Sequence, residues 1–182
     1  MTSRKADGVI SIRNAPNAQR GLWDLVDYIN NPSCIMAEIG SYVGDSTEIF
    51  AKSFTRVVAI DPWENGYDPK DPASYLIPMS EVEAQFDRLC KIYKNIVKLK
   101  MPSAVAAPKF LPNTLDFVYI DGIHTFHGVA SDIATWLPKI KEGGFIGGHD
   151  YSPKFSGVKK AVDSFHKPDK TFKDTSWIIS VK

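Results

Sequence analysis

The feature that most constrains the fold is the alternation of strand-like and helix-like stretches along the chain, joined by short turns. Short apolar runs rich in Val and Ile are followed by segments whose apolar residues recur every three or four positions. Parallel strands need long right-handed crossover connections, and helices provide them. This order therefore predicts an α/β fold: a doubly wound, mostly parallel sheet with helices on both faces.

The boundaries of the predicted elements follow from the apolar runs and the turn residues. Asp45 or Ser46 is expected to cap the second helix. Ser80, with Glu83 three residues later, has the spacing of a capping box for the third. The predicted strands are residues 34–40, 56–61, 95–101, 115–121 and 143–150, with an antiparallel one at 177–182. The predicted helices are residues 18–30, 45–50, 80–93, 125–140 and 157–165.

Length and composition indicate one domain. A chain of 182 residues, 43% hydrophobic and 24% charged, is long enough for one sizeable core and too short for two ordinary ones. Residues 1–182 are therefore expected to form a single domain with an N-terminal helical cap at 1–33. Residues 62–79 contain four prolines and three aromatic residues, which is typical of an ordered lid or substrate wall rather than regular structure.

The net charge and the hydrophobicity of the sequence argue against a nucleic-acid-binding, a secreted or a membrane-spanning protein. The formal net charge is +1 and no basic stripe is present, so neither nucleic acid nor an anionic membrane is an expected partner. The N-terminal residues lack the apolar run of a signal peptide, and no stretch is apolar enough to span a bilayer. Cys34 and Cys90 form no metal-binding or disulfide pattern. We expect a soluble, cytoplasmic protein that recognises its substrate locally.

A glycine-containing loop and an acidic residue follow two neighbouring predicted strands. Gly40 and Gly44, in the sequence EIGSYVGDS, let a ligand approach the backbone where a helix begins. Asp61 ends the next strand, 21 residues after Gly40, and can accept hydrogen bonds from two ribose hydroxyls. The plain alternatives are that the glycines only make a turn and that Asp61 only caps the segment after it.

The glycine spacing argues against a nicotinamide cofactor. A dinucleotide-binding loop needs G-x-G-x-x-G, whereas this loop has G-x-x-x-G preceded by Glu38. A carboxylate beside the loop repels phosphate and attracts an amino group. A ligand with a ribose and an amino group but no pyrophosphate fits these features, and S-adenosylmethionine is such a ligand.

Four segments resemble class I S-adenosylmethionine-dependent O-methyltransferases: AEIGSYVGDS, AIDPW, DFVYIDGIHTFHGVASDIATWLPKIKEGGFIGGHDY and GVKKAVDSF. The similarity runs from about residue 34 to the end and is greatest to the metal-dependent macrolide-sugar enzymes, with a further likeness to the catechol-type ones. It implies that the loop meets the methionine part of the cofactor and Asp61 its ribose. The other implied cofactor contacts are Glu38, Gly40, Ser41, Gly44 and Ser46 in the loop, Met101 and Ser103 at the adenine, Trp63 as a wall of the adenine or substrate side, and Asp121. The plain alternative for Trp63 is an aromatic residue of the core.

Two polar fragments, DGIH at 121–124 and GGHD at 147–150, follow neighbouring predicted strands. Asp121, His149 and Asp150 could therefore present two carboxylates and an imidazole to one Mg²⁺ or Mn²⁺ ion. In the sugar enzymes that the chain resembles, an acidic pair stands at 149–150, so His149 departs from the pattern and leaves the identity of the metal open. The plain alternative for Asp150 is that it caps a turn.

His124 is the expected general base, because it stands three residues after Asp121, where the sugar enzymes carry a histidine base. An unperturbed imidazole titrates near about pH 6.5, so it can accept a hydroxyl proton. The plain alternative is a solvated residue at a helix start.

The leading hypothesis is an O-methyltransferase acting on a hydroxyl of a small acceptor, with a sugar as one candidate. Trp63, Tyr67 and Tyr75 are available to stack on an acceptor ring, and a neighbouring subunit of a homo-oligomer could close the pocket. The main alternative is a non-catalytic module that binds S-adenosylmethionine but has no working acceptor site. A nicotinamide oxidoreductase and a nucleic-acid methyltransferase are weaker alternatives.

Overall fold

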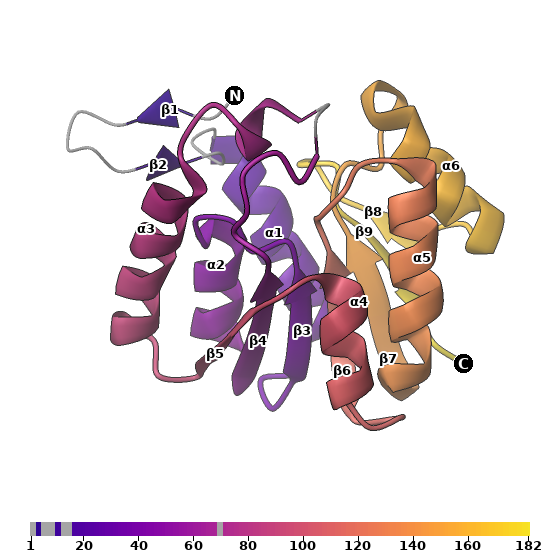
Figure 1. The fold of residues 1–182 in the computed structure, drawn as a ribbon. Coiled ribbons are helices and arrows are strands. Elements are labelled where there is room, and N and C mark those ends of the chain that lie inside the picture. Colours follow the sequence, from indigo (N-terminus) through magenta and orange to yellow (C-terminus); the bar gives the residue numbers. More distant parts are fainter. Residues whose placement is uncertain (1–2, 5–9, 12–15, 69–70) are drawn as a thin grey trace.

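The computed structural model describes residues 3–4, 10–11, 16–68 and 71–182. Its centre is a seven-stranded sheet with the strand order β5-β4-β3-β6-β7-β9-β8 (Figure 1). The first five of these run parallel, whereas β9 lies antiparallel to both β7 and β8. The strands are β3 (Ile35–Ile39), β4 (Arg56–Asp61), β5 (Ile96–Lys100), β6 (Leu115–Ile120), β7 (Ile140–Gly148), β8 (Lys170–Thr171) and β9 (Trp177–Ser180). The predicted doubly wound α/β sheet with an antiparallel C-terminal strand is confirmed.

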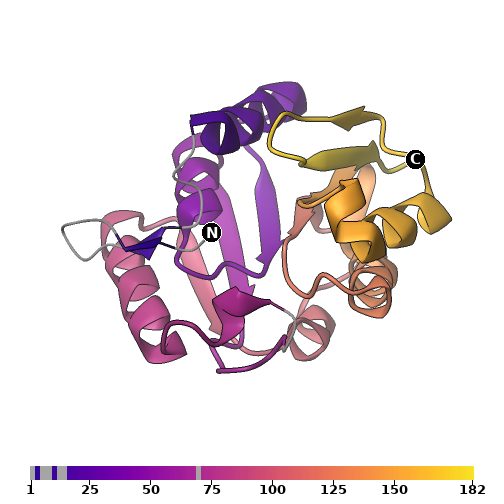
Figure 2. The same cartoon turned by 90° about the horizontal axis from the view of Figure 1, so that it is seen from above.

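Helices lie on both faces of the sheet, as the views from the side and from above show (Figures 1 and 2). One face is covered by α1 (Pro16–Ile29), α2 (Asp45–Ser53) and α3 (Met79–Ile92), and the other by α4 (Ser103–Ala106), α5 (Phe126–Trp136) and α6 (Ser156–Phe165). Short 3₁₀ turns complete the fold: η1 (Pro72–Ser74), η2 (Ala107–Lys109), η3 (Leu137–Lys139) and η4 (Pro153–Phe155).

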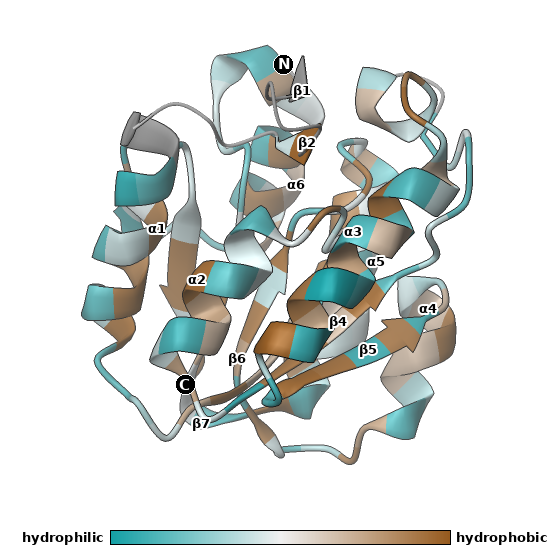
Figure 3. Ribbon diagram, turned by 90° about the vertical axis from the view of Figure 1, so that its left-hand side faces the viewer, coloured by the Kyte–Doolittle hydropathy of each residue, from teal (hydrophilic) through white to brown (hydrophobic). Residues whose placement is uncertain are grey.

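The core has two layers because successive side chains of a strand point to opposite faces. Met36 of β3 belongs to the same core cluster as residues of α1, α2 and α3, whereas its neighbour Ala37 belongs to the cluster that contains residues of α4, α5 and α6. In Figure 3 the central strands are largely hydrophobic and the helices carry hydrophilic residues among hydrophobic ones. Within the described residues, no helix is long and apolar enough to cross a membrane.

Several predicted helix ends were wrong. The cap residue of α2 is Gly44, in a left-handed conformation (φ 94°), and no side chain of the described residues caps it. Ser80 does not begin α3, because the helix starts at Met79 after Pro78 without a side-chain cap. The predicted helix 125–140 ends at Trp136, and the following strand starts at residue 140 instead of 143.

The two segments expected to flank the site are partly described. In the predicted helical cap, α1 is preceded by an antiparallel pair of two-residue strands, β1 (Ser3–Arg4) and β2 (Ile10–Ser11); the rest of residues 1–15 lies outside the described residues. In the predicted lid, residues 69–70 lie outside them too. Tyr67, Ala73 and Ile77 of the lid pack against the core that contains α1 to α3. The assignment of both segments as a cap and a lid stays a prediction.

Candidate active site

The loop after β3 packs tightly against the end of β6. Gly40 has φ 86°, and its N–H donates to the carbonyl of Ile60 at 2.9 Å. The N–H of Asp121 donates to the carbonyl of Ile39 at 2.7 Å. A β-carbon at position 40 would lie 2.2 Å from the carbonyl oxygen of Asp121, so only glycine fits between the two loops. The predicted cofactor loop and the predicted chemical residues are therefore in direct contact.

Gly40→Ala is expected to lower the free energy of unfolding by about 2 to 4 kcal/mol, since it adds a backbone clash to left-handed strain. Gly66→Ala is the matched control. Gly66 also has a positive φ, 72°, but a β-carbon there meets no atom within 4 Å among the described residues, so only about 1 kcal/mol is expected. Urea denaturation of both variants measures the difference, and equal losses would contradict the tight packing of Gly40.

Glu38 lies on β3 beneath the loop and is fully buried. Ser46 donates a hydrogen bond to one of its carboxylate oxygens at 2.6 Å, and Thr47 donates to the other. Burial raises the pKa of Glu38 to about 7, although these hydroxyl groups favour its charged form. The Ser46 side chain therefore binds Glu38 and does not cap the start of α2. The buried Ser41 also lies close to Glu38. The sequence did not indicate Thr47, because its role depends on this contact between a strand and a helix.

Asp61, at the end of β4, holds two loops together. Its carboxylate accepts from the N–H of Tyr42 at 3.0 Å and from the N–H of Trp63 at 2.7 Å. Asp61 thus does cap the segment that follows β4, and burial raises its pKa. The backbone of Ser41 also stabilises this carboxylate, and at least one of its four lone pairs is left for a ribose hydroxyl.

Trp63 lies in the core rather than on an open wall. Its side chain is 3% exposed, packs against Phe86 with ring centroids 4.8 Å apart, and donates through Nε1 to the carbonyl of Tyr42 at 2.9 Å. The ammonium group of Lys98 lies 4.7 Å from its ring centroid. A contact of Trp63 with the cofactor or acceptor stays a prediction, and the observed packing is that of a core residue.

The predicted adenine residues lie after β5. The N–H of Met101 donates to the carbonyl of Asp61 at 3.1 Å, so this loop is joined to the end of β4. The Ser103 hydroxyl donates to Asp132 at 2.6 Å and accepts from Nε1 of Trp136 at 2.8 Å. Burial raises the pKa of Asp132 to about 6. Because the Ser103 hydroxyl already donates to α5 and accepts from it, only one of its lone pairs is left, and adenine could use it only by donating an N–H.

The four residues predicted for chemistry form one group, here called the Asp–His cluster: Asp121, His124, His149 and Asp150. His124 Nε2 lies 2.9 Å from Asp150 Oδ2 and 4.0 Å from Asp121 Oδ1. His149 Nδ1 lies 3.2 Å from Asp150 Oδ1 and 3.7 Å from Asp121 Oδ1. Ligand atoms of Asp121, His124 and Asp150 all lie within 4.8 Å of one another, a spacing that one metal ion could bridge. His124 therefore enters the candidate metal group, for which the sequence indicated only His149 as the imidazole.

A family model described as a methyltransferase domain matches residues 37–151, which contain the glycine loop, Asp61 and the Asp–His cluster. This chain belongs to the methyltransferase family. It is a class I S-adenosylmethionine-dependent methyltransferase, as the sequence motifs had indicated. No curated protein sequence matches it.

Solved structures with the same fold include several methyltransferases. The O-methyltransferase NovP is 17% identical with a TM-score of 0.62, over 95% of this chain and 81% of NovP. Cofactor-bound Rv0187 from MTB is 15% identical with a TM-score of 0.62, over 93% of this chain and 82% of that one. An rRNA methylase from Streptococcus thermophilus is 11% identical with a TM-score of 0.59, over 94% and 100%. At these identities the likeness shows the fold alone.

The charges around His124 of the methyltransferase strongly favour its protonated form. Burial by itself would lower the pKa of His124, but the hydrogen bond to Asp150 and the charges of Asp121, Asp150 and Asp71 outweigh it and raise the pKa to about 9. Asp150 is also buried, which disfavours its charge, yet its contacts with His124 and His149 hold its pKa well below the ordinary value. The imidazole of this structure thus differs from the unperturbed one that the sequence led us to expect.

Two acidic residues of the predicted lid also reach the Asp–His cluster. His124 Nδ1 lies 3.7 Å from Asp71 Oδ2 and 3.9 Å from Asp68 Oδ2. The sequence shows both carboxylates, but they are about 50 residues from His124 along the chain, and only the folded lid brings them to it. Four carboxylates thus surround one imidazole.

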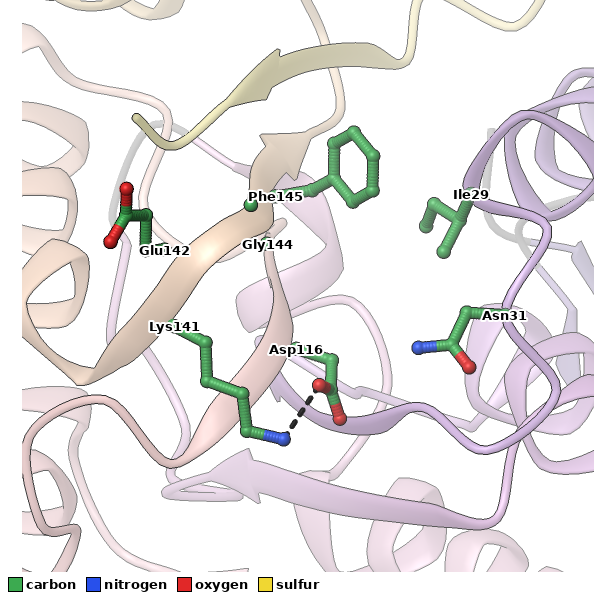
Figure 4. A pocket seen from close by; sticks show the side chains of 8 residues that line it. Ile29, Asn31, Asp116, Lys141, Glu142, Gly144 and Phe145 are labelled. Atoms are coloured by element: carbon green, nitrogen blue, oxygen red, sulfur yellow. Dashed lines mark hydrogen bonds and ion pairs between the residues drawn. The ribbon is translucent and has the colours of Figure 1, made fainter.

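Two hollows of the methyltransferase lie away from this site. A cavity of about 90 Å³ lies at the amino ends of β6 and β7, where Ile29 and Asn31 face Phe145 and the ion pair between Asp116 and Lys141 (Figure 4). A groove of about 450 Å³ lies between α1 and β8. In open α/β sheets ligands bind at the carboxyl ends of the strands, so the Asp–His cluster is the better candidate.

Proposed function

We propose that this methyltransferase moves the methyl group of S-adenosylmethionine to a hydroxyl of a small acceptor, with a sugar as one candidate. The observation that carries the proposal is the convergence of the Asp–His cluster beside the glycine loop. A neutral hydroxyl is a weak nucleophile, so its methylation benefits from a base or a cation. The Asp–His cluster offers groups suited to both tasks.

The Asp–His cluster fits a divalent metal ion. Two carboxylates and an imidazole within 4.8 Å form a mixed oxygen and nitrogen donor set that suits Mg²⁺ or Mn²⁺. Asp121 and Asp150 would hold the ion together with the imidazole of His124 or of His149. When bound, such an ion favours the alkoxide form of an acceptor hydroxyl.

The other residues of the site would orient the two substrates. The backbone at Gly40 lets the cofactor approach, Glu38 lies where a charged amino group would be attracted, and Asp61 offers lone pairs to the ribose. His124 would take the hydroxyl proton, provided that its neighbouring carboxylates are neutralised. Methyl transfer is an in-line displacement, so much of the rate depends on this alignment.

Asp61→Ala is expected to weaken S-adenosylmethionine binding by about 1.5 to 3 kcal/mol, because charge-assisted hydrogen bonds to the ribose are lost. Calorimetric titration measures the dissociation constant. Since Asp61 also holds the N–H groups of Tyr42 and Trp63, circular dichroism must show that the variant is folded. An unchanged dissociation constant in a folded variant would remove Asp61 from the cofactor site.

The proposed function is tested by mixing the protein and S-adenosylmethionine with hydroxyl-bearing acceptors, including simple glycosides and a catechol. Formation of S-adenosylhomocysteine is followed with Mn²⁺ or Mg²⁺ and then with EDTA. We expect turnover with at least one acceptor and its loss with EDTA. Cofactor binding without turnover of any acceptor would favour the non-catalytic module, and turnover that EDTA leaves unchanged would contradict the metal.

A further inference from the structure

His124 is held between two separate parts of the chain. Its Nε2 faces Asp150 and Asp121 at the strand ends, and its Nδ1 faces Asp71 and Asp68 of the lid. The ring also lies against Phe155, with centroids 5.1 Å apart and planes at 36°. Both nitrogens and one face of the imidazole therefore have defined neighbours.

The backbone of His124 is equally confined. Thr125 caps α5 by accepting a hydrogen bond from the N–H of Gly128 at 3.1 Å, so His124 stands immediately before the helix cap. A β-carbon at Gly157 of α6 would lie 2.8 Å from the carbonyl oxygen of His124. Because the backbone cannot move far, the groups around the ring decide where its nitrogens point.

Asp71 is presented to His124 by a fixed turn. One oxygen of its carboxylate, Oδ1, accepts from the N–H of Ala73 at 2.9 Å and caps η1, whose first residue is Pro72. The carbonyl of Asp71 accepts from the N–H of Ser74 at 3.0 Å. The cap thus engages one oxygen of the carboxylate, and the other, Oδ2, faces His124 Nδ1.

The turn itself is closed by a buried serine. Ser74 is 0% exposed, and its hydroxyl donates to the carbonyl of Asp68 at 2.5 Å. The N–H of Gly66 donates to the carbonyl of Ser74 at 2.7 Å. The lid segment that carries Asp71 is thereby cross-linked by hydrogen bonds and can fix the position of a side chain.

We propose that Asp71 is a positioning residue, which holds the Nδ1 edge of the His124 imidazole and so directs Nε2 toward Asp121 and Asp150. This inference rests on the proposed function, in which His124 acts on the acceptor or on the metal. A charge-assisted N–H···O bond is about 2.7 to 2.9 Å long, so the 3.7 Å separation needs a shift of only about 1 Å to become a direct one. Carboxylates in this outer position commonly orient a functional histidine and fix its tautomer.

The test compares Asp71→Asn with Glu64→Gln. Asparagine can still accept the N–H of Ala73 and keep the cap of η1, but it removes the charge that faces His124. Glu64 is an exposed carboxylate of the same lid segment and provides the matched loss of charge. Asp71→Glu keeps the charge and tests rescue.

We expect Asp71→Asn to lower kcat about 10- to 100-fold, to leave the KM for S-adenosylmethionine and the melting temperature unchanged, and to be partly rescued by Asp71→Glu. Glu64→Gln should behave as the wild type. A kcat within twofold of the wild type in Asp71→Asn would overturn the proposal, and so would a loss matched by a fall in melting temperature.

A second measurement separates this inference from the proposed function, because it needs no acceptor. The ¹⁵N chemical shifts of the His124 imidazole in the full-length protein report the protonation and the hydrogen bonding of each ring nitrogen. We expect Asp71→Asn to change them and Glu64→Gln to leave them as in the wild type. Identical shifts in all three proteins would overturn the proposal even where turnover is found. Changed shifts without turnover of any acceptor would support the contact and favour the non-catalytic module over the proposed function.

Discussion

Asp150→Asn is expected to lower metal-stimulated methyl transfer by at least about 100-fold, while S-adenosylmethionine binds within about twofold of its normal affinity. One oxygen of Asp150 lies 2.9 Å from His124 Nε2, and the other lies 3.2 Å from His149 Nδ1. The carboxylate thus joins both imidazoles, and its amide counterpart is a much weaker metal ligand. Losing even an outer partner of a metal site costs about 10- to 100-fold, and a direct ligand should cost more.

Asparagine is the suitable replacement because Asp150 has φ 60°. Asparagine adopts this left-handed conformation with little strain, whereas alanine would add about 1 kcal/mol of backbone strain. Asp27→Asn, at an exposed position of α1, is the control for the same chemical change. The rate of S-adenosylhomocysteine formation with Mn²⁺ measures the effect. An Asp150→Asn enzyme that Mn²⁺ still stimulates fully would remove Asp150 from the metal site.

Glu38→Gln is expected to weaken cofactor binding at least about tenfold and yet to stabilise the protein without cofactor above pH 7. A buried carboxyl whose pKa is about 7, against an ordinary value of 4.5, binds more protons in the folded state than in the unfolded one. The free energy of unfolding therefore falls as the pH rises through the window from about 4.5 to 7, by about 3 kcal/mol in total. Glutamine has no such penalty, but it also lacks the charge that we propose attracts the amino group of the cofactor.

Urea denaturation of both proteins at pH 5 and pH 8 tests this trade-off. The wild type should lose about 3 kcal/mol more than Glu38→Gln between the two pH values, since all other titrating groups are shared. Parallel pH dependences would show that folding leaves the pKa of Glu38 at its ordinary value. Calorimetric titration with S-adenosylmethionine measures the loss of affinity separately.

The strands were predictable because their signal is local. Residues 56–61 are dense in β-branched and apolar side chains, and β4 has these bounds. The residues at strand ends were predictable for a related reason, since the carboxyl ends of parallel strands meet at one edge of the sheet. Asp121 and Asp150 lie together for this reason, although they are almost 30 residues apart in sequence.

The predicted helix caps were wrong because residues that are distant in sequence bind the same side chains. Ser46 donates to Glu38 on β3, which leaves Gly44 to begin α2. Glu83 accepts from Lys98 and Lys100 of β5 instead of closing a capping box with Ser80. Capping rules consider only a few neighbouring residues, so contacts between a helix and a strand override them.

The pKa of His124 could not be predicted from the sequence either. The motif placed His124 correctly beside Asp121, but the lid brings Asp71 and Asp68 to its other nitrogen. The pKa of an imidazole depends on the charges around it in space, and these come from three separate segments of the chain. The expected value near 6.5 was therefore wrong for the folded protein, in which the pKa is raised to about 9.

The most direct test of the central claim, a methyltransferase site built on a divalent metal, is binding of Mn²⁺ to the S-adenosylhomocysteine-loaded protein, followed by electron paramagnetic resonance. It needs no knowledge of the acceptor. We predict one saturable site in the wild type that is lost in Asp150→Asn and retained in Asp27→Asn. The absence of saturable binding, or binding that Asp150→Asn leaves unchanged, would contradict the metal centre at the Asp–His cluster.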